Sequence, residues 1–428
     1  MCRSDRVCTV FVVAVVWAFC TLFTASAPVT IVHMTGIHGQ PFYDFLVDRA
    51  AAFERQYPDV HMEIQNHPSG YADKLLAMLG TGMQVDVIDS TPTLLLKNDK
   101  DYFADLNPYL KADNVDLYRL IPAMMSRRVL ESEGRLLALP NQLYSSVVGY
   151  NRSVFDELGV APLGSLGDEW NWEWIRRNAA RLTIDVDGDG QPETVGIGFS
   201  RNLERVAAAV HQAGGAFFEK DLNPRQALFD TAEVRQGLAF YVEIVERGWA
   251  RIGGTLNNRA VAIDLATFGT TATFLRQTED VWEAVVQPKG PVRRGGPFWL
   301  GPMRVMKESE NPEWGCRWLC FLTLDQESQV QMMRMTGRLP LHMPTLSRLD
   351  TYLNYETATV RDYLRQLADA SIDDDNFPTV VSPVKNDMVR VFDQSWAQVL
   401  NGSLALESFT GEIQRRIQAI LDELHATP

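Results

Sequence analysis

From residue 29 onward the hydrophobic positions alternate between two spacings, one typical of strands and one typical of helices. Val29–Met34 is a short apolar run, and apolar residues then recur at helical spacing over 42–53. The pattern continues with a strand at 60–64, a helix at 71–79 and a strand at 85–89. Strands that alternate with helices predict an α/β protein with open sheets, in which ligands bind beyond the carboxyl ends of the strands.

The stretch from Gly134 to Asn151 predicts two apolar strands joined by a break. The break begins at Pro140 and contains Asn141, Gln142 and Tyr144. A strand that stops, presents polar and aromatic side chains and then resumes is unlike plain core. We expect this stretch to cross between two lobes, with Tyr144 facing the cleft between them.

The rest of the chain continues the α/β pattern and suggests where the lobes divide. A Pro- and Gly-rich segment at 287–296 is expected to return the chain between lobes. We therefore predict an N-terminal lobe from 28–140 plus 287–338 and a C-terminal lobe from 141–286 plus 339–428. Further helices are expected at 151–159, 203–211, 231–247, 311–322, 325–336 and 408–424, and further strands at 194–199, 259–265, 281–286 and 298–306.

Length and composition favour two globular domains and exclude nucleic-acid binding. A chain of 428 residues is too long for one ordinary core. Its net charge of -14, with no long run of Lys or Arg, repels phosphate backbones. The seven histidines lack metal-ligand spacing, and the sequence contains no P-loop and no nucleophile elbow. Paired acids for glycoside hydrolysis have no fixed spacing, so an extracytoplasmic glycosidase stays an alternative.

Residues 1–27 have the layout of an export signal. Two arginines precede an apolar run over 7–23, and the small residues 25–27 follow. Pro28 is unfavourable after a cleavage site and the run is just long enough to span a bilayer, so an uncleaved membrane anchor is the alternative. Lipid attachment at Cys20 ranks second to the export signal, because the residue directly before it, Phe19, is not small. The mature chain is expected at the periplasmic or extracellular face.

Several phrases, in order along the chain, resemble the family 1 bacterial extracellular solute-binding proteins, the maltodextrin- and glycerol-phosphate-binding subunits of ABC importers. Residues 134–151 resemble the family's GKIYGLPY…YN segment, and the helix that ends at 57–60 resembles EFEKKYPGI. Residues 311–323 are similar to KNPEAAWEFLKFLT, and 337–340 to GYLP. The resemblance implies a type II periplasmic-binding-protein fold of two α/β lobes. It also implies a monomeric, non-enzymatic receptor that traps a solute between the lobes and delivers it to permease subunits.

A carbohydrate site needs flat aromatic rings for stacking and polar side chains for directed hydrogen bonds. Residues that meet these needs follow predicted strands or lie beside the predicted crossings, although most Trp and Phe residues of any chain are core. A glycerol-phosphate ligand, the alternative, would need clustered cations. The expected ligand contacts are His38, Asp89, Ser90, Asn141, Gln142, Tyr144, Trp172, Phe268, Phe298, Trp299 and Arg338.

An acidic loop resembles a calcium-binding loop in part. Asp185, Asp187 and Asp189 occupy its first, third and fifth positions, and a glycine occupies the sixth. The twelfth position is also glycine instead of a bidentate glutamate, which leaves Glu193 to complete the shell. The alternative is a polar hairpin turn. No cofactor is expected to be required, and calcium, if bound, would be structural.

Overall fold

The computed structural model describes residues 28–36, 38–91, 95, 99–121, 130–253, 259–267, 278–354 and 356–426. The expected export signal or anchor, residues 1–27, lies outside these ranges. Among the described helices, none is both long and apolar enough to span a bilayer.

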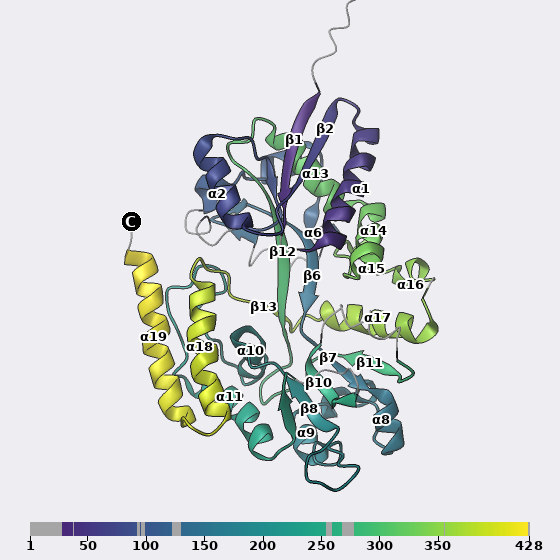
Figure 1. The fold of residues 1–428 in the computed structure, drawn as a ribbon, viewed down its shortest axis with the longest axis vertical. Coiled ribbons are helices and arrows are strands. Elements are labelled where there is room, and N and C mark those ends of the chain that lie inside the picture. The colour runs from purple at the N-terminus through teal and green to yellow at the C-terminus, as the bar shows by residue number, and fades with distance from the viewer. Residues whose placement is uncertain are drawn as a thin grey trace, which may run out of the picture.

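The first lobe is built on a mixed six-stranded sheet (Figure 1). Its order is β13-β12-β3-β1-β2, and β6 also pairs with β12. β1 runs parallel to β2 and β3, whereas β12 runs antiparallel to β3 and β6. The strands are β1 Val29–Thr35, β2 Val60–Asn66, β3 Val87–Ile88, β6 Leu139–Ser145, β12 Pro297–Val305 and β13 Phe377–Pro378, and β4 Glu131–Ser132 forms a separate hairpin with β5 Arg135–Leu136.

Helices of the first lobe bury the faces that the periodicity predicts. In α1, Phe42, Phe45, Leu46 and Phe53 are all buried against the sheet. They form one core with Trp318 of α13. The helices of this lobe are α1 Gln40–Gln56, α2 Tyr71–Thr81, α4 Asp99–Tyr102, α5 Asn107–Ala112, α6 Leu117–Leu120, α13 Pro312–Leu324, α14 Gln326–Thr336 and α15 Met343–Leu346.

The second lobe contains a five-stranded sheet in the order β11-β7-β10-β8-β9. Its strands are β7 Val147–Asn151, β8 Val195–Phe199, β9 Ala250–Ile252, β10 Val261–Thr267 and β11 Trp282–Val285. Two open sheets flanked by helices confirm the predicted α/β class. The helices are α8 Arg152–Glu157, α9 Trp172–Asn178, α10 Leu203–Gln212, α11 Ala232–Glu246, α16 Leu349–Tyr352, α17 Ala358–Ser371, α18 Lys385–Leu400 and α19 Leu406–Ala426, with short 3-10 turns η1 Leu163–Ser165 and η2 Gly167–Glu169.

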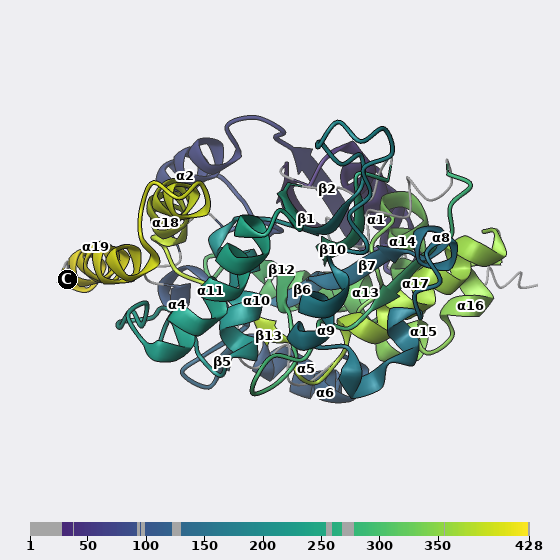
Figure 2. The same ribbon diagram turned by 90° about the horizontal axis from the view of Figure 1, so that it is seen from below.

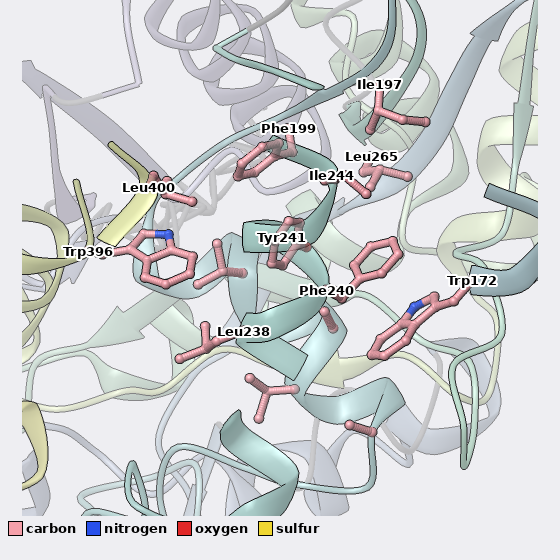
Figure 3. Close-up of a cluster of buried hydrophobic side chains, with 14 of the residues drawn as sticks. Trp172, Ile197, Phe199, Leu238, Phe240, Tyr241, Ile244, Leu265, Trp396 and Leu400 are labelled. Atoms are coloured by element: carbon pink, nitrogen blue, oxygen red, sulfur yellow. The ribbon is translucent and has the colours of Figure 1, made fainter. Parts of the chain in front are cut away.

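Aromatic side chains dominate the second core. Figure 3 shows Phe199 beside Tyr241 and Phe240 beside Trp172, and both pairs stack, with ring centres 4.7 Å and 4.4 Å apart. α18 and α19 cover one side of this core, whereas α16 and α17 lie at the opposite edge of the molecule (Figure 2). Ile413, Ile417 and Leu421 of α19 are fully buried, as the predicted amphipathic pattern requires.

The chain changes sheets at Ser146, between β6 and β7. Pro140 does not end a strand as we expected, and the predicted lobe boundary after residue 140 falls inside β6. Proline is tolerated there because the β6–β12 pairing is irregular near Pro302, so no regular ladder bond is lost. The Gln287 side chain donates to the carbonyl O of Ser146 at 3.0 Å and of Leu265 at 2.9 Å, which ties the return segment to the first crossing.

Candidate functional site

A cleft of about 800 Å³ lies between the two lobes. It opens beyond the carboxyl ends of β1 and β3, the position expected for a ligand in an open α/β sheet. Tyr144 and Trp299 are directly opposite each other in the β6–β12 pairing, so both rings lie on the same face of the sheet. The lining includes His38, Asp89, Ser90, Thr91, Gln142, Tyr144, Ser200, Asn202, Glu204, Arg205, Phe298, Trp299, Arg304, Thr379, Ser382, Lys385 and Asn386.

Asp89 lies at the floor of the cleft, directly after β3. Its side chain is fully buried, and neither carboxylate oxygen makes a hydrogen bond of good geometry within the described residues, although the Thr35 hydroxyl lies nearby. Burial raises the pKa of Asp89 from 3.8 to about 7, although the Thr35 hydroxyl and the Arg338 guanidinium act in the opposite direction. A buried carboxylate without partners is costly for the folded state. A hydrogen-bond donor that reached the Asp89 carboxylate would relieve this cost.

Two histidines beside Asp89 are uncharged at neutral pH. Trp318 Nε1 donates to His33 Nδ1 at 2.9 Å, which assigns the ring proton to Nε2, 3.7 Å from a carboxylate oxygen of Asp89. Burial lowers the pKa of His33 to about 3. The pKa of His38, whose Nε2 lies 3.0 Å from the carbonyl O of Asp89, is lowered to about 4, mainly by burial. Neither ring therefore neutralises the Asp89 carboxylate.

Arg338 lies behind Tyr144 and places a positive charge near the cleft floor. Its guanidinium carbon is 5.7 Å from the centre of the Tyr144 ring, and Nη2 donates to the carbonyl O of His38 at 3.4 Å. Nη1 is buried without a partner in the described part of the chain, and so is Oε1 of Gln142. Asp89 and Gln142 thus have acceptor atoms, and Arg338 has a donor atom, that lack a hydrogen bond of good geometry among the described residues.

Trp299 of β12 connects the cleft floor to the second lobe. Glu204 Oε1 accepts a hydrogen bond from Trp299 Nε1 at 3.0 Å and another from Lys385 Nζ at 3.3 Å. The Arg205 guanidinium lies 4.5 Å from the indole centre, over the face of the ring. Burial lowers the pKa of Arg205 to about 10, so this group stays charged at neutral pH. Together these contacts fix the orientation of the indole in the cleft.

Most of the predicted contact residues lie at this cleft. Arg338 does not line it directly but contacts two residues that do, and Phe298 lines it although only 1% exposed. Phe268 and the side chain of Asn141 lie outside the described residues. The predicted residues that line the cleft are His38, Asp89, Ser90, Gln142, Tyr144, Phe298 and Trp299.

Trp172 does not contact the cleft as we expected, because it lies in the core of the second lobe. It is 4% exposed, stacks on Phe240 and donates through Nε1 to Gln212 Oε1 at 2.7 Å. The residue opens α9 and turns inward with its neighbours Trp170 and Trp174. The sequence alone does not distinguish an inward-facing tryptophan from one that faces a cleft.

Sequence reasoning missed the charged residues of the second lobe. Glu204 and Arg205 lie in the first turn of α10, directly after β8, and Lys385 begins α18. Glu204 and Arg205 could have been selected from the sequence, since they follow the predicted strand at 194–199 and the carboxyl ends of strands are where ligands bind. Lys385 follows no predicted strand, so the pattern gave no reason to select it.

The acidic loop brings three of its four carboxylates together. Ligand oxygens of Asp185, Asp187 and Glu193 lie within 4.8 Å of one another, whereas Asp189 is not part of this group. Backbone amides of the loop already donate to these side chains, as in Gly190 N to Asp185 at 2.9 Å. Calcium binding here stays a prediction.

Residues 38–327 match the family model described as bacterial extracellular solute-binding protein. The chain belongs to this family. It is therefore a non-enzymatic receptor, the solute-binding component of an ABC importer, which removes the glycosidase alternative. No curated protein sequence matches the chain significantly.

Solved structures of such receptors share the fold at low sequence identity. An ABC substrate-binding protein from Listeria monocytogenes in complex with cycloalternan has a TM-score of 0.71 and 18% identity, with 94% of this chain and 100% of that chain covered. The sugar-binding protein MalE from Xanthomonas citri has a TM-score of 0.73 and 19% identity, with 92% and 98% covered. A cyclic alpha-maltosyl-1,6-maltose binding protein from Arthrobacter globiformis has a TM-score of 0.73 and 16% identity, with 92% and 100% covered.

Proposed function

We propose that the solute of this receptor is a carbohydrate, bound between the lobes and delivered to a membrane permease. The observation that carries the proposal is the combination, in one cleft, of the paired rings of Tyr144 and Trp299 with polar lining residues that include Asp89 and Gln142. Hydroxyl groups both donate and accept, so a sugar can form hydrogen bonds with the acidic, amide and hydroxyl side chains of the lining. The apolar faces of the same ring can stack on the aromatic side chains.

The names of the structural neighbours agree with this chemistry, since all three receptors above are described with a sugar ligand or as sugar-binding. At identities below 20% these likenesses show only the fold. The proposal therefore rests on the cleft residues of this chain. The ligands named for the neighbours indicate which sugars to test first.

Binding couples to lobe closure. The Asp89 end of the cleft belongs to the first lobe and Glu204, Arg205 and Lys385 to the second, so a solute that touches both ends favours the closed form. A micromolar site requires about 8 kcal/mol, which several hydrogen bonds and stacked rings can supply after the cost of closure. The closed form would then dock on the permease through both lobes.

A phosphorylated polyol is the second candidate, because three cations, Arg205, Arg304 and Lys385, line the cleft. All three already make contacts within the protein, and the guanidinium of Arg205 lies over the Trp299 ring. Arg304 donates to Thr91 Oγ1 at 2.9 Å, and Lys385 pairs with Glu204 at 3.3 Å. Because these cations already have partners and Asp89 carries a negative charge when it is ionised, a neutral sugar is the better match.

Isothermal calorimetry and thermal shift with a panel of mono- and oligosaccharides test the proposal, with glycerol phosphate as the competing ligand. We expect saturable binding of at least one sugar, a rise in melting temperature and no change in the sugar itself. Tight binding of glycerol phosphate but of no sugar would favour the second candidate. A sugar that is turned over would contradict the assignment as a receptor.

A further inference from the structure

A second hollow, of about 450 Å³, lies in the second lobe on the other side of the first turn of α10. It is lined by three separate parts of the chain besides Arg293: α10, the segment 214–233 and the segment 377–380. Glu204, Pro378 and Thr379 line both this hollow and the cleft. The two spaces are therefore adjacent and share these three wall residues.

The walls of the second hollow combine aromatic side chains with polar groups. His211 stacks on Phe377 with ring centres 4.3 Å apart, and both residues line the space together with Phe217 and Phe218. Thr231, which caps α11, is among the polar groups of the lining. This mixture of aromatic and hydrogen-bonding side chains suits a sugar ring, as it does in the cleft.

The charges of the lining favour an uncharged ligand over an anionic one. The lining includes the acidic residues Glu204, Asp221 and Glu233 against one arginine, Arg293. An anionic sugar would meet more repulsion than attraction there, whereas a neutral sugar would not. The chemistry of the hollow thus fits an uncharged part of a solute better than a phosphate or a uronic acid.

Two glycines lie in the wall of the second hollow, where the backbone packs closely against neighbouring residues. A Cβ atom at Gly215 would lie 2.9 Å from the Cβ of Glu233, and one at Gly214 would lie 3.1 Å from a methyl group of Val292. Gly214 also has a φ of 91°, a conformation that side chains rarely adopt. The backbone at this rim is therefore held close to its neighbours without side chains that would fill the space.

We propose that the second hollow is a subsite for the outer residues of a neutral oligosaccharide whose other end lies in the cleft. This inference rests on the proposed function. Together the two spaces exceed the range of about 300–1,000 Å³ of ordinary small-molecule sites, as an extended oligomer requires. The receptor accordingly prefers longer chains over di- and trisaccharides of the same sugar.

An obstructing substitution tests the subsite without touching the cleft. Ala216 is an exposed loop residue that lines the second hollow and not the cleft, so Ala216→Trp fills part of the space from its edge. Ala161 is also an exposed loop alanine of this lobe and lines neither space, so Ala161→Trp is the matched control. Arg293→Ala, which removes an exposed polar wall residue, is an independent second variant.

The purified protein and its variants are screened by native mass spectrometry against neutral oligosaccharide ladders from starch, cellulose, mannan and xylan, and hits are titrated by calorimetry. For the best ladder we expect Ala216→Trp to weaken the longer chains about tenfold, equivalent to about 1.4 kcal/mol. Binding of di- and trisaccharides and the affinities of Ala161→Trp should stay within about twofold of the unmodified protein. Arg293→Ala should shift the longer chains in the same direction.

Three results would overturn the subsite: no preference of the unmodified protein for longer chains, unchanged affinity of Ala216→Trp for them, or an equal loss for short and long chains. The last would show that the cleft itself was distorted. If the unmodified protein binds no member of any ladder and none of the sugar panel, the proposed function fails, which is a different outcome from a sugar that binds in the cleft alone.

Discussion

Asp89→Asn should stabilise the protein at alkaline pH while weakening its binding of solute. In the folded state the carboxylate is buried and has a pKa of about 7, against an ordinary value of 3.8. Each tenfold step in an ionisation constant corresponds to about 1.4 kcal/mol, so ionised Asp89 costs the fold up to about 4 kcal/mol at pH 8. The amide of asparagine must also be desolvated, so the expected net gain is about 2 kcal/mol.

The sign of this effect depends on pH in a defined way. Because the folded-state pKa is raised, the folded protein holds the Asp89 proton between about pH 4 and pH 7 while the unfolded chain releases it. Stability is therefore lost as the pH rises through this window, and the cost is fully present above pH 7. At pH 4 the same relation gives a destabilising cost of less than about 1 kcal/mol. The advantage of Asp89→Asn should shrink accordingly between pH 8 and pH 4.

Asp86 gives a matched control three residues earlier. It is also buried, but its carboxylate accepts from Val32 N at 2.8 Å and from Ser309 Oγ at 2.5 Å. An amide cannot accept all of these bonds equally well, so Asp86→Asn should lower stability by about 1–3 kcal/mol.

Thermal shift and urea unfolding of both variants and the unmodified protein at pH 8, 6 and 4 measure these differences. If Asp89→Asn raised the free energy of unfolding by the same amount at every pH, the idea that Asp89 carries a buried charge would be wrong. A loss at pH 8 as large as that of Asp86→Asn would show that Asp89 has satisfied hydrogen bonds in the fold. Titration of the best sugar should separately show weaker binding by Asp89→Asn, since hydrogen bonds to a charged acceptor are about twice as strong as neutral ones.

Further predictions concern the cleft, the acidic loop and the crossing. Tyr144→Ala should weaken sugar binding by about 1–3 kcal/mol in calorimetry while the fold is kept, whereas Tyr102→Ala, which alters an exposed tyrosine 39% accessible, should leave it unchanged. Affinity for sugar should fall about tenfold between pH 8 and pH 6 as Asp89, with a pKa of about 7, takes up a proton, and a flat profile would contradict its role as the acceptor. If the acidic loop holds calcium, excess EDTA should lower the melting temperature of the unmodified protein but not that of Asp185→Asn, and an unchanged value for the former would count against the metal. Gly296→Ala should destabilise the protein by more than about 2 kcal/mol in urea unfolding, because a Cβ there would lie 2.3 Å from the carbonyl O of Ser146 in the paired crossings.

The sequence by itself determined the elements and much of their order. Period-two and period-3.6 patterns are local, so α1 and α19 and the strands β1, β2 and β8 lie where the pattern predicts. The rule that ligands bind at the carboxyl ends of strands selected Asp89 and Ser90, and the interrupted apolar stretch selected Gln142 and Tyr144.

Only the tertiary structure decided which of several similar residues carry the site. Trp172 and Trp299 were both predicted ligand contacts, yet the first lies in a core and the second in the cleft, held by Glu204 of another element. Asp86 and Asp89 flank the same two-residue strand, yet only the first has donors at good hydrogen-bonding geometry. Burial and hydrogen bonding of a side chain depend on partners from distant parts of the chain, and no local spacing records where those partners will meet.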